Sequence, residues 1–149
     1  MKININFDPR IYNDVYFPLL RENTRIQIIF GGGGSGKSVF LSQRGVEDIL
    51  KGGRNYLVCR NTGNTIRKSV FNEVKKAINK SRDLQRLFKI NKSEMTITCI
   101  NGYQILFAGL DDIEKLKSIT PEIGVITDIW IEEATEISYE SFKGLEKLS

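Results

Sequence analysis

The sequence predicts an α/β fold in which a mostly parallel sheet carries an antiparallel hairpin insertion. Apolar runs of strand length alternate with segments whose apolar residues recur at helical spacing. Chains that alternate in this way build parallel sheets, because each helix carries the chain back to the edge where the last strand began. The apolar runs at 95–100 and 103–107 flank Asn101-Gly102, a pair that favours a tight turn between antiparallel strands.

The remaining elements follow in order along the chain. The predicted parallel strands are residues 25–30, 56–59 and 125–131. The first of them ends abruptly in four glycines, which is typical of a buried strand bounded by a loop. The predicted helices are residues 38–50, 65–78, 110–119 and 138–148. Residues 2–7 alternate like a short strand, and residues 8–18 predict irregular structure because Pro9 and Pro18 interrupt them.

Composition excludes several classes of protein. A chain of 149 residues corresponds to about one domain, and 40% hydrophobic with 27% charged residues is typical of a folded soluble protein. The absence of histidine excludes Ser-His-Asp triads, histidine-ligated zinc and histidine general bases. A formal net charge of +4 is compatible with a nucleic-acid partner without demonstrating one.

The cysteines and the apolar runs indicate a cellular setting. Cys59 and Cys99 both lie in strand-like runs, so we expect two buried, reduced core residues. The first ten residues contain no apolar signal segment, and no apolar run approaches the ~20 residues of a membrane span. We therefore expect a reducing cytoplasm and no membrane partner.

Residues 31–38, GGGGSGKS, match the phosphate-loop pattern G-x-x-x-x-G-K-[ST] in full. Glycines let the backbone curl until several amides face one anion, and the helix that begins there adds its own unsatisfied amides. Lys37 is placed to reach the terminal phosphates, and the Ser38 hydroxyl to ligate Mg²⁺. The predicted ATP-binding residues are Gly31, Gly33, Gly34, Ser35, Gly36, Lys37 and Ser38. The plainer alternative is a flexible loop that binds nothing.

A magnesium–nucleotide site also needs a carboxylate at the end of a neighbouring strand. The apolar run at 129–131 leads into Glu132 and Glu133. Side chains that are adjacent in an extended segment point in opposite directions, so the two acids have different tasks. We assign Glu132 to Mg²⁺, where the pattern more usually has Asp, and Glu133 to the attacking water. Asp128 is the rival metal ligand if the strand ends early, and a charged cap on a surface helix is the alternative interpretation.

Four segments together resemble the large terminase subunits of tailed bacteriophages, from about Tyr16 to the end of the chain. They are GGGGSGKS, CRNTGNTIRKSVFNEVKKAI, FAGLDDIEKLKSI and IWIEEATEIS. The resemblance implies a P-loop NTPase core of the RecA/helicase-like, glutamate-type class, with ATP and Mg²⁺ as cofactors and Lys37 and Glu133 as catalytic residues. It also implies a ring-shaped motor in the bacterial host cytoplasm that packages double-stranded DNA, with the portal protein and the small terminase subunit as partners.

The resemblance leaves the source of an arginine finger open. Family members often carry a basic residue inside the phosphate loop, where this chain has only glycine from 31 to 34. Arg60 and Arg67 are candidates within the chain, and a neighbouring subunit is another source; solvated or DNA-facing cations are the plainer interpretation. The candidate contacts to DNA phosphates are Lys75, Lys76, Lys80, Lys115 and Lys117.

The family's topology also predicts an incomplete sheet. We interpret residues 1–149 as a partial ATPase domain, with an N-terminal segment at 1–24 and the core at 25–149, and we expect the nuclease domain to be absent. In the family's arrangement a later strand lies between the phosphate-loop strand and the acidic strand. We therefore expect a slot between 26–30 and 125–131, weak stability, little turnover and association through the slot.

Two other classes of function remain open. A helicase or another glutamate-type ATPase would translocate along single strands without a portal partner. A fragment that binds nucleotide without turnover would lack hydrolysis altogether. A small-molecule kinase is weaker, because a glutamate that activates water suits hydrolysis better than transfer to an acceptor.

Overall fold

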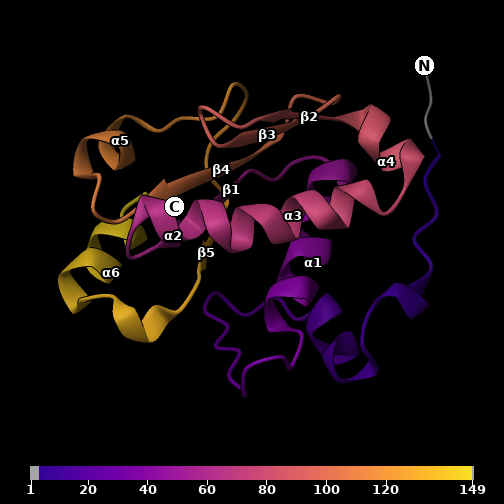
Figure 1. Ribbon diagram of the computed structural model, residues 1–149, viewed down its shortest axis with the longest axis horizontal. Helices are drawn as coiled ribbons and strands as arrows, with labels where there is room; N and C mark the ends of the chain where they lie inside the picture. Colours follow the sequence, from indigo (N-terminus) through magenta and orange to yellow (C-terminus); the bar gives the residue numbers. More distant parts are fainter. Residues whose placement is uncertain (1–3, 149) are drawn as a thin grey trace.

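The computed structural model describes residues 4–148, which form a five-stranded sheet with helices on both faces (Figure 1). The strand order is β2-β3-β4-β1-β5. The strands are β1 (Tyr56–Arg60), β2 (Phe88–Asn91), β3 (Thr96–Cys99), β4 (Gln104–Gly109) and β5 (Asp128–Ile131). The α-helices are α1 (Lys37–Lys51), α2 (Gly63–Lys68), α3 (Val70–Asn79), α4 (Arg82–Leu87), α5 (Ile113–Ser118) and α6 (Tyr139–Glu146).

The sheet is mixed, which confirms the α/β class but corrects the expected excess of parallel strands. β1 pairs in parallel with both β4 and β5. β3 pairs antiparallel with β4 around the Asn101-Gly102 turn, as predicted, and antiparallel with β2 on its other side. The sequence pattern did not reveal β2, whose four residues follow the short helix α4 directly.

Each face of the sheet packs against its own set of helices. Val58 and Phe107 face a core shared with α1 and α3, whereas Leu57 and Leu106 face a smaller core that includes Leu145 of α6. This alternation follows from the two-residue period of a strand. None of the helices within the described range 4–148 is long and apolar enough to cross a membrane.

Helix α1 has the bounds that its sequence signals predict. It begins directly after Gly36 and ends at Lys51, where Gly52 caps it with a φ of 81° that suits glycine. The helix predicted at 65–78 is instead two helices that meet at Ser69, with φ −111° and ψ −98°. The Ser69 hydroxyl donates to the Thr65 carbonyl at 2.6 Å and accepts from Arg60, so these bonds accompany the break.

The predicted strand at 25–30 is wrong. These residues have no ladder partner in the described structure. Ile29 packs on the small aromatic cluster beside α1, but Ile28 and Phe30 are 82% and 90% exposed. Exposure alternates along this segment as in a strand that packs one face on the protein. The length of the apolar run did not indicate whether another strand lies beside it.

The edge of β5 that faces away from β1 likewise pairs with no strand among residues 4–148. Residues 26–30 and β5 are therefore not directly paired, but residues 26–30 form no strand, so a slot between two strands is not shown. Weak stability and association at this edge stay predictions. Residues 125–127 precede the strand and do not belong to it.

The N-terminal segment folds onto α1 as two 3₁₀ helices, Pro9–Ile11 and Asp14–Arg21. The predicted strand at 2–7 lies partly outside the described residues, and 4–7 form no strand. Cys59 and Cys99 are buried and unbonded, as expected, and burial raises the pKa of the Cys59 thiol to about 12.

Candidate functional site

The glycine-rich loop, residues 31–38, lies at the start of α1 and leaves that helix without a side-chain cap. Gly34 and Gly36 have φ of 77° and 84°, values that only glycine adopts without strain. Gly36 is the N-cap of α1, and no side chain accepts a hydrogen bond from the first turn. The amides of that first turn are therefore available to an anion, together with the positive end of the helix dipole.

Lys37 folds back over the loop that precedes it. Its ammonium donates to the Gly31 carbonyl at 2.7 Å, to the Gly32 carbonyl at 3.0 Å and to the Ser35 hydroxyl at 3.2 Å. Three donors thus meet three neutral acceptors, with no carboxylate among them. This arrangement holds a positive charge at the mouth of the loop, where an anion can replace the neutral acceptors.

The loop and the acidic segment meet through Ser38 and Glu132, 94 residues apart in sequence. The Ser38 hydroxyl donates to Glu132 Oε1 at 2.6 Å. The other carboxylate oxygen, Oε2, accepts from the Trp130 indole nitrogen at 2.9 Å. Both residues assigned to Mg²⁺ therefore lie together, and the buried Trp130 fixes the orientation of the carboxylate.

Glu133 differs from Glu132 in exposure and in backbone conformation. It is exposed, and its backbone is left-handed, with φ 51° and ψ 55°. Few residues other than glycine adopt this conformation, which costs of order 1–3 kcal/mol, and such residues cluster at functional sites. The expected alternation along a strand does not apply, because β5 ends at Ile131 and the two acids lie in the turn that follows. Their separate tasks stay a prediction.

Asp128 does not compete for the same position. It is the first residue of β5, and Glu132 follows the last, so the two are separated by the length of the strand, about 13 Å. Arg54 contacts the Asp128 carboxylate at 3.5 Å, and the Thr127 hydroxyl donates to it at 2.8 Å. The alternative metal ligand depended on an earlier strand end, and that premise is wrong.

The two candidate arginine fingers are both occupied within the chain. Arg60 lies at the end of β1 beside the acidic segment, where it pairs with Glu136 at 3.3 Å and donates to the Ser69 hydroxyl at 3.3 Å. Arg67 donates to the Lys92 carbonyl in the turn after β2. Of the two, Arg60 is the one whose neighbours belong to the candidate site.

Pattern reasoning missed two residues that hold the site together, Trp130 and Tyr16. Trp130 lies two positions before Glu132, so the strand period would have placed both side chains on one face. Tyr16, which donates to the Ser35 carbonyl at 2.8 Å, lies in the segment of 3₁₀ helices, and no periodicity there could have connected it to the loop.

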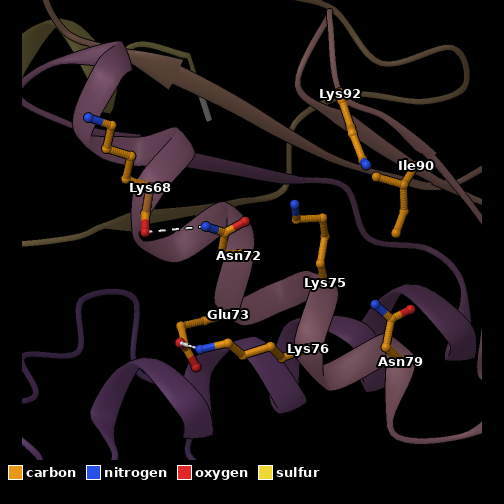
Figure 2. Close-up of a pocket in the computed structure, with 8 residues that line it drawn as sticks. All are labelled: Lys68, Asn72, Glu73, Lys75, Lys76, Asn79, Ile90 and Lys92. Atoms are coloured by element: carbon orange, nitrogen blue, oxygen red, sulfur yellow. Dashed lines mark hydrogen bonds and ion pairs between the residues drawn. The ribbon is translucent and has the colours of Figure 1, made fainter.

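A lysine-lined depression lies apart from the loop, on α2, α3 and the turn after β2 (Figure 2). Its lining residues are Lys68, Asn72, Glu73, Lys75, Lys76, Asn79, Ile90 and Lys92. Four lysines against one glutamate give a net formal charge of +3, beside +4 for the whole chain. Glu73 pairs with Lys76 at 2.7 Å. Among the residues described, no carboxylate pairs with Lys68, Lys75 or Lys92.

The lysines singled out from sequence do not share one surface. Lys75 and Lys76 line the depression, whereas Lys115 and Lys117 lie on α5. Leu116 of α5 packs against the core on the other face of the sheet. Lys80 follows α3 and is exposed.

The residues present fit a magnesium ion that shares its ligands with a phosphate chain. No group of three or more potential metal-ligating acids, cysteines or histidines gathers anywhere in residues 4–148. Mg²⁺ in nucleotide sites commonly takes only one or two protein ligands and completes its shell with phosphate oxygens and water. Ser38 and Glu132, both oxygen donors and already in contact, match that requirement.

Comparison with known proteins gives consistent matches. A family model described as phage terminase large subunit matches residues 23–148. The large terminase subunit of Bacillus phage SPP1 is 34% identical over 114 residues, which cover 76% of this chain and 27% of that protein. The PBSX phage terminase large subunit of Bacillus subtilis (strain 168) is 34% identical over 144 residues, covering 97% of this chain and 30% of that protein. The chain thus spans less than a third of the length of these two relatives.

Proposed function

The chain belongs to the phage terminase large subunit family, and we propose that it is the ATP-binding and ATP-hydrolysing segment of a motor that drives double-stranded DNA into a phage capsid. One observation carries the proposal. The Ser38 hydroxyl and the Glu132 carboxylate, each assigned to Mg²⁺ on separate grounds, lie 2.6 Å apart at the mouth of an uncapped helix.

The chain's own groups divide the work of holding Mg·ATP. The amides of the loop and of the first turn of α1 take the terminal phosphates, and Lys37 exchanges its carbonyl partners for phosphate oxygens. Ser38 and Glu132 hold the metal, while Trp130 keeps the carboxylate in place. Bound magnesium neutralises the charge that develops on the phosphate oxygens.

Glu133 is the proposed residue for the attacking water. It is exposed, directly follows the metal-side acid and has a left-handed backbone. A carboxylate so placed accepts a proton from water or orients it. Arg60, which reaches across to Glu136, keeps the acidic segment against the end of β1.

The lysine-lined depression is the proposed contact to DNA phosphates. Charge gathered in one depression supports binding to a polyanion, because neutralised phosphates release their counterions. Replacing Lys75 and Lys92 with glutamine should lower the slope of log affinity against log salt by about 2, near 0.9 for each lost contact. The matched control replaces Lys115 and Lys117, on the other face. An equal loss in the control would move the contact away from the depression.

The partners in this proposal are those of a packaging machine. We place the chain in a homo-oligomeric ring, with the portal protein and the small terminase subunit as neighbours, in the cytoplasm of the bacterial host. The relatives' names, both of phage terminase large subunits, support a DNA-packaging setting in general.

Nucleotide binding and turnover test the proposal separately. Lys37→Ala should abolish Mg·ATP binding, and Lys51→Ala, at the other end of the same helix, should leave it unchanged. Glu132→Ala should weaken only the magnesium-dependent part of the affinity. Glu133→Gln should keep ATP bound while turnover in the full motor falls by ~10²-fold or more, the range for a lost general base.

Each outcome discriminates between the functions. Equal affinity in Lys37→Ala would remove the nucleotide site. Unchanged turnover in Glu133→Gln would transfer the water-activating role to Glu136 or to a partner subunit. Tight Mg·ATP binding without turnover in the full motor would favour the second candidate, a nucleotide-binding segment that does not hydrolyse. Both acids would share one task if their variants behaved alike.

A further inference from the structure

We propose that Tyr16 is a positioning residue of the glycine-rich loop, whose hydroxyl fixes one peptide plane of the loop in the orientation that receives the phosphate chain. The inference rests on the proposed function, since it assigns a part to the N-terminal segment in the same site. The family match begins at residue 23, so it gives Tyr16 no role.

The contact falls on a residue of the loop that has glycine on both sides. The Tyr16 hydroxyl donates to the Ser35 carbonyl oxygen at 2.8 Å. Ser35 stands between Gly34 and Gly36, and both glycines are left-handed. Glycine populates both signs of φ with little preference, so side-chain sterics on the Gly36 side do not fix the peptide between Ser35 and Gly36. The Tyr16 hydroxyl adds a contact from outside the loop, a tether that holds this peptide.

The tether acts through the rigid peptide plane. In a trans peptide the carbonyl and the following N–H point in opposite directions. Holding the Ser35 carbonyl toward Tyr16 therefore turns the Gly36 N–H away from it. The same bond fixes the entry to α1, because the Gly36 carbonyl accepts the first helical bond, from the Phe40 amide at 2.9 Å.

The Tyr16 ring is itself held in place. It is 7% exposed and stacks on Phe40, with ring centroids 4.7 Å apart and an angle of 13° between planes. Phe40, in the first turn of α1, is 1% exposed. The hydroxyl is thus carried by a ring with little freedom, and the hydrogen bond orders the loop at small entropic cost.

Tyr12 provides a matched control within the same segment. It is buried and packs edge-on against Phe40 at 5.9 Å. Its hydroxyl donates to Glu47, in the middle of α1, and not to the loop. Removal of either hydroxyl costs one hydrogen bond, but only one of the two bonds reaches residues 31–38.

The experiment compares Tyr16→Phe, Tyr12→Phe and wild type for binding of Mg·ATP and of inorganic tripolyphosphate with Mg²⁺. Urea unfolding in the same buffer gives the folded fraction, and each dissociation constant is corrected for it. We expect Tyr16→Phe to raise both constants by about 3- to 10-fold, the effect of one net hydrogen bond. Tyr12→Phe should change neither, although both variants lose stability.

Comparison of the two ligands distinguishes a failure of the proposed role of Tyr16 from a failure of the nucleotide site. Equal behaviour of the two variants would overturn the role of Tyr16 while leaving the nucleotide site intact. A loss for ATP without a loss for tripolyphosphate would also overturn it, by placing Tyr16 against the nucleoside instead of the loop. A wild-type chain that binds neither ligand would overturn the proposed function and this inference together.

Discussion

The core between the sheet and α3 and the region around the glycine-rich loop are stabilised by different means. In the core, Phe71 and Phe107 are 1% and 0% exposed and meet edge to face at 4.9 Å. Around the loop, Ile28 and Phe30 are exposed, burial is limited to a small aromatic cluster, and polar contacts such as the one between Ser38 and Glu132 connect the segments. Stability and binding should therefore respond to different substitutions. Loss of buried surface in the core should lower stability, and loss of hydrogen bonds around the loop should lower ligand affinity.

The largest expected change in stability comes from a substitution in the core. Phe71→Ala removes a fully buried ring and its contact with Phe107, so we expect the free energy of unfolding to fall by about 3–5 kcal/mol. Ile28→Ala, on an 82% exposed side chain, should stay within about 0.5 kcal/mol. Urea denaturation measures both. A large loss in the Ile28 variant would mean that the exposed stripe is covered in solution.

An intermediate effect probes the loop. At Gly36, where φ is 84°, an alanine side chain is strained, and we expect Gly36→Ala to lose about 1–2 kcal/mol of stability. Mg·ATP affinity should fall as well, because the N-cap of α1 shifts. Gly33→Ala is the control for stability, since a Cβ there has no atom within 4 Å. Comparable destabilisation at both positions would show that the left-handed conformation is not the cause.

The smallest expected effect is a pH dependence of stability that comes from Cys59, in the core. Burial raises the pKa of Cys59 from 9.0 to about 12. The unfolded thiol therefore ionises first as the pH rises, and this stabilising contribution is complete below pH 9 and lost between about pH 9 and 12. From pH 8 to 10, wild type should lose on the order of 1 kcal/mol more stability than Cys59→Ala, measured by urea unfolding. Parallel pH profiles would exclude ionisation of this thiol as a cause.

Local signals predicted the parts of the fold that depend on neighbours in sequence. Helix α1 and the Asn101-Gly102 hairpin follow from caps and turn residues, and they were predicted nearly to the residue. Residues 25–30 have the composition of a strand, but a strand forms only where a second strand pairs with it. The pattern of one segment does not reveal which distant segment lies beside it.

The candidate site likewise has a part that could be predicted from sequence and a part that could not. The loop and the acidic pair carry recognisable residue types at fixed spacing, so Ser38 and Glu132 could be named from sequence. Their meeting, and the supporting contacts from Trp130 and Tyr16, depend on the tertiary fold. The Arg60–Glu136 pair is a similar case, because its partners lie on segments 76 residues apart.

The most direct test of the nucleotide site uses Trp130, the chain's single tryptophan, whose indole donates to Glu132 at 2.9 Å. The tryptophan emission is titrated with ATP in the presence and absence of Mg²⁺, in wild type and in Lys37→Ala. If Ser38 and Glu132 hold the metal of a bound nucleotide, the emission should change saturably with ATP only when Mg²⁺ is present, and Lys37→Ala should abolish the change. The same response without Mg²⁺, or an undiminished response in Lys37→Ala, would contradict a magnesium–nucleotide site at this loop.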